Sequence, residues 1–476
     1  MHHQPPDYRR RYANPGPTRR AHLRLAALAC AVLTVVPVGL VALPATAAAA
    51  ATPPTLVTLT FDDSNVDQLG AAQTMSGKGL VGTFYTVSGF VDAPGYLTQA
   101  NLHTIAAAGN EIAGHTVTHP DLATLSNAES QRQICNDRAT LTSWGFAVTS
   151  FAYPFASASA ANEQVAQGCG YNSARGLGDV ESRFGCTGCG YAETLPPDDF
   201  YYTKALDEVD STWTMADLQS TVVNAENNGG GWVQLTFHHV CTGCDALSVT
   251  PALFDQFTTW LAGRAATTNT VVRTVQQVLG GAAKPLVAAP VVPAPAPGVN
   301  GIHNPSLETA GTTTLPQCWT AGGYGTNTPS FTTTTTTAAA HTGSKAETLT
   351  VSGYASGDAK LLPTLDLGEC APTVTPGHTY SLRTWYRASS VTQFAVYLRN
   401  SIGTWSYWTS SPWYAPATGW TAAVWAAPAI PAGATGISFG LNVFTNGTLS
   451  TDDYELYDTT GAPAAPGVAA HTARGR

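Results

Sequence analysis

Two adjacent carboxylates stand at the end of an apolar, β-branched run near residue 60. Asp62 and Asp63 stand just after the strand-like stretch 56–60. Neighbouring carboxylates repel each other, so a fold tolerates them best where a cation binds one and the other works as a base. For the Asp-Asp pair taken alone, a solvated turn is the simpler explanation.

Two histidines follow about fifty residues later along the chain. His115 and His119 stand four residues apart, and this spacing predicts that both imidazoles share one face of a helical turn. Both rings then reach one ion at about 2.0–2.1 Å. Two surface histidines before Pro120 are the alternative for this motif alone. Together with Asp63, they predict a three-ligand metal site that keeps open positions for water.

A third histidine ends another hydrophobic run. His238 follows the stretch 232–237, which has the composition of a buried strand. A lone histidine in such a place is more often a hydrogen-bonded core residue. Here the order of the strands places it opposite the other candidate residues, which favours the role of general acid.

A regular scaffold is needed to bring these residues together. From Thr55 onward, short β-rich runs alternate with amphipathic stretches. The pattern predicts strands at 56–60, 81–87, 145–151 and 232–237, and helices at 101–108, 128–142, 215–227 and 251–263. This βαβ rhythm predicts a parallel sheet closed or nearly closed into a (β/α) barrel, whose active site lies at the carboxyl ends of the strands.

The order of the motifs resembles the polysaccharide deacetylase family, also described as NodB-homology proteins or family 4 carbohydrate esterases. The shared motifs are Thr-Phe-Asp-Asp at 60–63, His-Thr-x-x-His at 115–119, Phe-Ala-Tyr-Pro-Phe at 151–155 and the histidine at a strand end, within about residues 55 to 280. The resemblance implies a distorted (β/α)7 barrel that binds Zn²⁺ or another divalent metal such as Co²⁺. It also implies roles for single residues: catalytic base Asp62, metal ligands Asp63, His115 and His119, and catalytic acid His238. The backbone N–H of Phe155 is then the expected donor to the oxyanion.

The sequence departs from the family pattern at several positions. Ser64 stands where the family usually has Gly, and Ala152 stands where an arginine commonly orients the catalytic base. We hypothesise that Arg175 supplies the missing guanidinium. Asp210 is the candidate for orienting the catalytic histidine, and His239 replaces the aspartate that often follows that histidine.

The N-terminal fifty residues have the composition of a signal peptide, of either the Sec or the twin-arginine type. A basic stretch precedes an apolar run from 25 to 43 and an Ala-rich site. A retained membrane anchor is the alternative. Removing residues 1–50 takes away six Arg and one Asp, which leaves 16 basic and 30 acidic residues and a net charge of −14. The signal peptide predicts a secreted protein that does not bind a membrane once the peptide is cleaved. The negative charge predicts that the protein does not bind nucleic acid. We also expect a monomer.

Eight of the nine cysteines lie beyond the signal segment. In an oxidising compartment an even number favours disulfides. The two Cys-Thr-Gly-Cys motifs also allow a structural zinc site. The expected disulfide residues are Cys135, Cys169, Cys186, Cys189, Cys241, Cys244, Cys318 and Cys370.

A Pro/Ala-rich linker at 282–299 separates the catalytic domain, 51–281, from a domain of different composition at 300–462, before a tail at 463–476 expected to be disordered. Short alternating runs predict a β-sandwich, and its two ends resemble jelly-roll carbohydrate-binding modules. The Thr run 332–337 fits either disorder or a strand. By that resemblance Glu308 and Asp453 are candidate Ca²⁺ ligands. Trp405, Trp408 and Trp413 are candidates for stacking on sugars, although about half of such aromatics belong to an ordinary sandwich core.

Together these features predict a secreted enzyme that removes N-acetyl groups from a GlcNAc-containing polymer such as chitin or peptidoglycan. An O-acetyl xylan esterase uses the same metal and water, so it remains an alternative. A non-catalytic carbohydrate-binding protein is the other alternative, and Ala152 is the residue that favours it.

Overall fold

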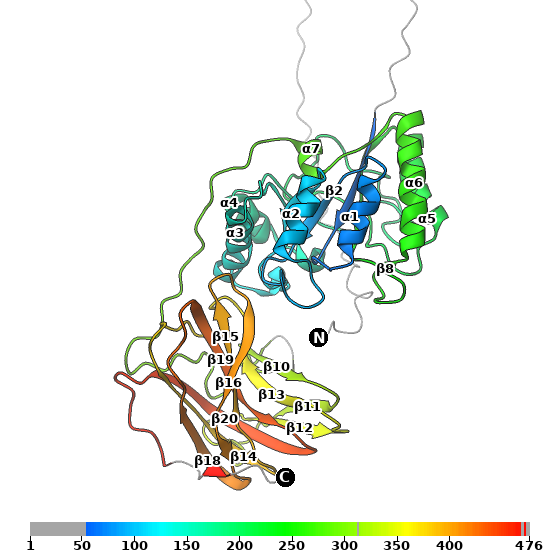
Figure 1. Cartoon of the computed structure of the whole chain (residues 1–476). Helices are drawn as coiled ribbons and strands as arrows, with labels where there is room; N and C mark the ends of the chain where they lie inside the picture. Colours follow the sequence, from blue (N-terminus) through cyan, green and yellow to red (C-terminus); the bar gives the residue numbers. More distant parts are fainter. Residues whose placement is uncertain (1–53, 312–313, 468–470, 473–476) are drawn as a thin grey trace, which may run out of the picture. The chain divides into compact units, whose positions relative to one another are not determined.

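A computed structural model of the chain describes residues 54–311, 314–467 and 471–472 (Figure 1). The predicted signal peptide, residues 1–50, lies outside the described residues. Within those described ranges, we find no helix that combines the length and the apolar composition needed to cross a membrane.

A parallel sheet forms the centre of the N-terminal domain, with strand order β5-β4-β3-β2-β1-β6. Its strands are β1 (Thr55–Phe61), β2 (Gly82–Thr86), β3 (Glu111–Gly114), β4 (Ser150–Ala152), β5 (Ser173–Arg175), β6 (Gly231–Phe237) and β9 (Thr270–Val272). β6 pairs with β1 along its whole length, whereas β9 pairs with the first half of β1 and β2 with the second half. β1 is therefore paired on both sides, and six of its seven residues are buried.

An irregular segment, 203–209, lies between β5 and β6 and closes the sheet on itself. The N–H of Thr203 donates to the carbonyl of Ala174 in β5 at 2.8 Å, and the N–H of Val209 donates to Thr236 in β6 at 2.8 Å. Isolated bridges accompany both contacts. The predicted distorted barrel is thus confirmed, and its distortion lies in this segment, which joins the two edge strands without forming a regular strand.

Seven α-helices are described in this domain: α1 (Gln68–Ser76), α2 (Gln99–Ala107), α3 (Asn127–Ser143), α4 (Ala160–Gly168), α5 (Met215–Asn227), α6 (Pro251–Thr267) and α7 (Val275–Leu279). Short 3₁₀ turns occupy Leu122–Thr124 and Pro154–Ala156. Local sequence fixes where helices start, and α5 is an example. The Thr214 hydroxyl accepts from the N–H of Asp217, while the Asp217 side chain accepts from the N–H of Thr214. All four predicted helices are confirmed to within a few residues.

The strand predicted at 145–151 is wrong over most of its length. β4 begins only at Ser150, and Gly145 has a left-handed φ of 95° just after α3 ends. Phe146 and Val148 are buried in the core, but no strand pairs with them. Burial of a loop, rather than pairing in a sheet, therefore accounts for the apolar residues that suggested a strand.

All four disulfides join cysteines that were expected to be bonded. Cys135 bonds to Cys169, Cys318 bonds to Cys370, and each Cys-Thr-Gly-Cys motif closes on itself. No group of potential metal ligands within the described ranges combines the two motifs, so the structure does not assemble a four-cysteine zinc site from them.

Two five-stranded antiparallel sheets form the C-terminal domain and confirm the predicted β-sandwich. One sheet contains, in spatial order, β10 (Trp319–Tyr324), β13 (Asp358–Pro363), β19 (Ala434–Val443), β15 (Phe394–Asn400) and β16 (Trp405–Ser410). The other contains β11 (Thr328–Thr333), β12 (Glu347–Ser352), β20 (Gly447–Asp458), β14 (Tyr380–Ala388) and β18 (Ala417–Ala426). The inward side chains of these strands form one apolar core.

Three features concern the segments around this sandwich. Residues 282–299, the predicted linker, contain no helix or strand. The first two residues of the Thr run 332–337 belong to β11. Near the end of the chain, β21 (His471–Thr472) pairs with β17 (Trp413–Tyr414), within the stretch that the sequence predicts as a disordered tail.

Candidate active site

The two adjacent carboxylates lie at the carboxyl end of the central strand. Asp62 is buried, and its N–H donates to the carbonyl of Phe237 at 3.0 Å, so β6 holds the end of β1. Asp63 and Ser64 have left-handed φ angles of 74° and 64°. The Ser64 hydroxyl accepts a hydrogen bond from the N–H of Val87 at 2.9 Å. A serine in place of the usual glycine is thus compatible with this turn, because its side chain gains a partner there.

The two histidines of the second motif converge, but the predicted helical turn is wrong. Residues 115–119 form no helix, and Thr116 and His119 have left-handed φ angles of 71° and 56°. The Thr116 hydroxyl accepts from the N–H of His119 at 3.0 Å, which stabilises the turn. The ring centroids of His115 and His119 lie 4.8 Å apart. The i, i+4 spacing therefore brings the imidazoles together through a tight non-helical turn.

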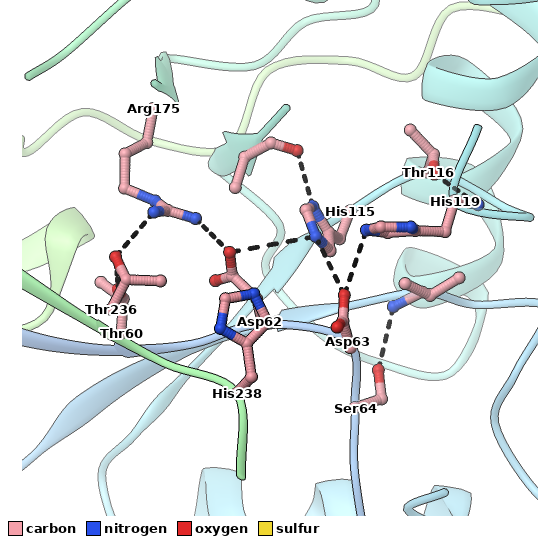
Figure 2. A network of polar contacts seen from close by, with 12 residues as sticks. Thr60, Asp62, Asp63, Ser64, His115, Thr116, His119, Arg175, Thr236 and His238 are labelled. Carbon is pink, nitrogen blue, oxygen red and sulfur yellow. Dashed lines mark hydrogen bonds and ion pairs between the residues drawn. The ribbon is translucent and has the colours of Figure 1, made fainter. Parts of the chain in front are cut away.

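Asp63, His115 and His119 form a group of ligand atoms that lie within 4.8 Å of one another. The Oδ1 atom of Asp63 lies 3.4 Å from Nε2 of His115 and 3.1 Å from Nε2 of His119 (Figure 2). Nδ1 of His115 is 2.8 Å from the carbonyl of Ala152, which directs Nε2 towards the carboxylate.

This donor set fits a divalent cation. The Oδ1 atom of Asp63 is buried and accepts no hydrogen bond within the described part of the chain. Burial acts to raise the pKa of Asp63, yet the adjacent imidazoles of His119 and His115 lower that pKa well below its usual range. An ionised oxygen facing two imidazole nitrogens is the ligand combination that zinc and cobalt accept.

Arg175, at the end of β5, contacts the second carboxylate. Its Nη2 atom lies 2.5 Å from Oδ2 of Asp62, and its Nη1 atom donates to the Thr236 hydroxyl at 2.7 Å (Figure 2). The guanidinium is fully buried and packs over the ring of Tyr85 at 5.0 Å. The structure thus places an arginine beside the candidate base, although this chain has Ala152 at the motif position where the arginine was expected.

His238 directly follows β6, and Figure 2 shows it among the residues around the two carboxylates. The His238 carbonyl accepts from Asn65 Nδ2 at 3.1 Å and from Gln68 Nε2 at 2.8 Å, so the backbone here is fixed. Nδ1 of His238 is buried and has no hydrogen-bond partner within the described ranges.

The comparisons identify the segment that carries most of this site. Residues 49–174 match the family model described as polysaccharide deacetylase. This segment is a polysaccharide deacetylase domain. It includes both carboxylates, His115 and His119, whereas Arg175 and His238 lie beyond the matched range. No curated protein matches the chain.

Solved structures similar to this chain include several deacetylases. An acetyl xylan esterase from Clostridium thermocellum, in complex with a cobalt ion, is 18% identical over 47% of this chain and 90% of its own, with a TM-score of 0.34. The peptidoglycan deacetylase PdaC from Bacillus subtilis is 17% identical over 47% and 90%, with a TM-score of 0.31. The deacetylase PplD from Streptococcus pyogenes, in complex with acetate, is 18% identical over 35% and 69%, with a TM-score of 0.30.

Two further sequence-predicted residues have definite surroundings in the N-terminal domain. Phe155 has a left-handed φ of 57°, and its ring packs edge-on against His119 with centroids 4.6 Å apart. Asp210 accepts from both the N–H and the hydroxyl of Thr212. Nδ1 of His238 has no hydrogen-bond partner within the described residues, so the orienting role of Asp210 stays a prediction.

Asp137 is a site residue that the sequence did not suggest. It lies in α3, where its Oδ1 atom accepts from the N–H of Ser88 and its Oδ2 atom accepts from the N–H of His115, both at 3.1 Å. Burial raises the pKa of Asp137 to about 8. Gly114 must lack a side chain, because a Cβ there would lie 2.0 Å from the Tyr171 hydroxyl and 2.7 Å from Oδ2 of Asp137. No periodicity marks Asp137, because it stands in a strongly polar helix.

Asp137→Asn is expected to weaken both the fold and the metal site. An amide offers one acceptor where the carboxyl offers two, so one buried N–H loses its partner at a cost of about 1–3 kcal/mol of unfolding free energy. Metal affinity should fall by about 10–100-fold, as for other groups that support a ligand. Urea unfolding and metal titration measure the two effects. Gln131→Ala, an exposed change in the same helix, should alter neither.

The candidate residues of the sandwich domain are engaged in local contacts. Glu308 accepts from the N–H groups of Ser344 and Lys345, and Asp453 pairs with His341. Neither acid belongs to a group of three potential ligands within the described ranges, so calcium binding stays a prediction.

The three candidate tryptophans, Trp405, Trp408 and Trp413, are all half-buried. Trp405 donates to a backbone carbonyl, and Trp408 packs against the sandwich core. Trp413 meets Phe444 edge-on. The sequence did not suggest another cluster, in which His341 stacks on Trp385 with centroids 4.0 Å apart.

Proposed function

We propose that this chain is a secreted, metal-dependent deacetylase that hydrolyses N-acetyl groups of a GlcNAc-containing polysaccharide, of the chitin or peptidoglycan type. The observation that carries the proposal is that two adjacent carboxylates contact different partners. Asp63 faces two imidazole nitrogens, whereas the adjacent Asp62 faces a guanidinium. One carboxylate is thus arranged as a ligand, and the other remains available as a base.

Asp63, His115 and His119 would hold Zn²⁺ or another divalent ion such as Co²⁺. A divalent ion at this position supplies Lewis acidity towards an acetyl carbonyl and a water molecule. Asp62 accepts the proton of the attacking water, and Arg175 fixes the orientation of the Asp62 carboxylate through Oδ2. The unpaired Oδ1 atom of Asp62 is the one left to receive that proton.

His238 donates a proton to the leaving nitrogen on the opposite side of the site. Amide cleavage requires this proton, because an amide anion is a very poor leaving group. The backbone N–H of Phe155, next to His119 in the same site, stabilises the negative oxygen of the tetrahedral intermediate.

Acetate release measured side by side on chitin oligomers, peptidoglycan and acetylxylan tests the proposal, with and without chelator. Chelator-sensitive release from a GlcNAc polymer is the expected result. Release from acetylxylan alone would replace the proposal with an O-acetyl esterase. No release from any of the three by metal-loaded protein would favour the non-catalytic binding protein instead.

Arg175→Ala is expected to lower the rate of acetate release by about 10–100-fold, because Asp62 loses the partner that orients it. Arg175→Lys should recover only part of the rate, because a single ammonium cannot contact Asp62 and Thr236 in the bidentate manner of a guanidinium. Added guanidinium ion should restore activity to Arg175→Ala. A variant that lost activity merely by misfolding would not respond, and unchanged activity in Arg175→Ala would contradict the role.

A further inference from the structure

A second group of potential metal ligands lies outside the site described above. Asp67, His239, Cys241 and Cys244 each offer one ligand atom, and these four atoms lie within 4.8 Å of one another. Nδ1 of His239 is 2.7 Å from Oδ2 of Asp67. Within the described ranges, it is one of two such groups, and the Asp63 group is the other.

The backbone around this group is fixed on both sides. β7 (His239–Val240) pairs with β8 (Ser248–Val249), and the loop between them carries both cysteines. The Oδ1 atom of Asp67 accepts from the N–H of Val240 at 2.8 Å, so the start of α1 is tied to the same short strand. The two strands, this hydrogen bond and the disulfide between Cys241 and Cys244 therefore keep the four residues near one another.

The other Cys-Thr-Gly-Cys motif provides an internal comparison. Cys186 and Cys189 have the same tetrapeptide sequence and are also bonded to each other. No histidine or acid within the described ranges joins them in a group of three potential ligands. The surroundings of Cys241 and Cys244, rather than the CxxC spacing alone, thus distinguish the second site.

We propose that, in the dithiol form of the 241–244 pair, Asp67, His239, Cys241 and Cys244 bind one thiophilic divalent cation of the zinc class. Reducing the disulfide takes two electrons and two protons, which a thiol or phosphine reductant supplies. Binding then forms two metal–sulfur bonds, and both thiol protons pass to solvent. In a tetrahedral site the ligand atoms lie about 3–4 Å apart, so only small side-chain shifts are needed.

The position of this site gives it a structural consequence. His239 directly follows His238, and both lie where β6 leaves the barrel. A cation bound to His239 crosslinks the start of α1 to the 241–244 loop and so fixes the backbone that carries His238. The site itself is independent of the proposed deacetylase activity, because it shares no ligand with the Asp63 group.

Cobalt is the probe for the test, because thiolate ligands give Co²⁺ a near-ultraviolet charge-transfer band and oxygen or nitrogen ligands do not. Full-length protein is reduced with a phosphine under nitrogen, loaded with Co²⁺ and desalted. Two cobalt ions per chain and the sulfur band are the expected result. Asp63→Ala should remove one ion and keep the band, which separates this site from the proposed catalytic metal.

Paired cysteine variants locate the sulfur ligands. The Cys241→Ser/Cys244→Ser variant should lose one cobalt ion and the band, whereas the matched Cys186→Ser/Cys189→Ser variant should keep both. His239→Gln retains the cysteines and therefore the fold of the oxidised protein. After reduction it should bind the second cobalt at least about tenfold more weakly. A single cobalt ion without a sulfur band in reduced wild-type protein would overturn the proposal. So would a band that is lost in the Cys186→Ser/Cys189→Ser variant but kept in the Cys241→Ser/Cys244→Ser variant.

Discussion

Asp62→Asn should lower the rate of acetate release by about 10³-fold, within the range that general base catalysis contributes. Asparagine has nearly the shape of aspartate but cannot accept the proton of the attacking water. The three atoms that form the Asp63 group are unchanged, so the variant should bind metal as the wild type does. Acetate release and metal content, measured on the same preparation, check both expectations.

The same substitution leaves the buried Arg175 without its carboxylate, so a loss of stability has to be separated from a loss of chemistry. Breaking one side of a buried ion pair commonly costs about 3–5 kcal/mol. The double variant Asp62→Asn/Arg175→Gln removes both charges and should regain part of the lost thermal stability. It should remain inactive. Recovery of activity together with stability would show that Asp62 serves the fold and not the reaction.

Asp63→Ala should abolish metal binding at the first site and with it nearly all activity. The alanine leaves two imidazoles in place of three ligands, and a bound ion contributes several kcal/mol to the transition state, which corresponds to a loss of about 100-fold or more. Metal analysis of the oxidised protein, in which the 241–244 disulfide is intact, measures the first site alone. Activity is measured with Zn²⁺ and with Co²⁺ added back after chelation.

Asp255→Ala is the matched control for that experiment. Asp255 is a largely exposed aspartate in α6 whose carboxylate pairs with Lys78 on the surface. Its removal should leave metal content and acetate release unchanged. Wild-type metal content in Asp63→Ala would mean that the ion binds elsewhere, and the assignment of the three ligands would fail.

Several parts of the site could be predicted from the sequence because they follow strands. Asp62 and Asp63 follow β1, and His238 follows β6, and these two strands pair along their whole length. Parallel strands that pair in register bring their carboxyl ends together, so residues 176 positions apart along the chain meet in space. The family resemblance implies an arginine that orients the base, and Arg175, which we predicted for that role, lies against Asp62 in the structure.

Other parts could not be predicted, for physical reasons that differ from residue to residue. The turn that holds His119 depends on left-handed backbone at Thr116, and threonine gives no sign of such a conformation. Asp137 acts through backbone N–H groups that only the folded chain brings near it. The closing segment 203–209 has neither helical nor alternating periodicity, because isolated β-bridges join it to the sheet in place of a continuous ladder of strand hydrogen bonds.

The pairing of β1 on both sides has a consequence for the dynamics of the molecule. The amide protons of this strand are expected to exchange with deuterium only when the whole domain unfolds, because both neighbours must separate to expose them. The amides of 203–209 should exchange sooner, through local openings that leave the rest of the sheet intact. The barrel would then open first along that seam, while the tip of β1 that carries the two carboxylates stays rigid.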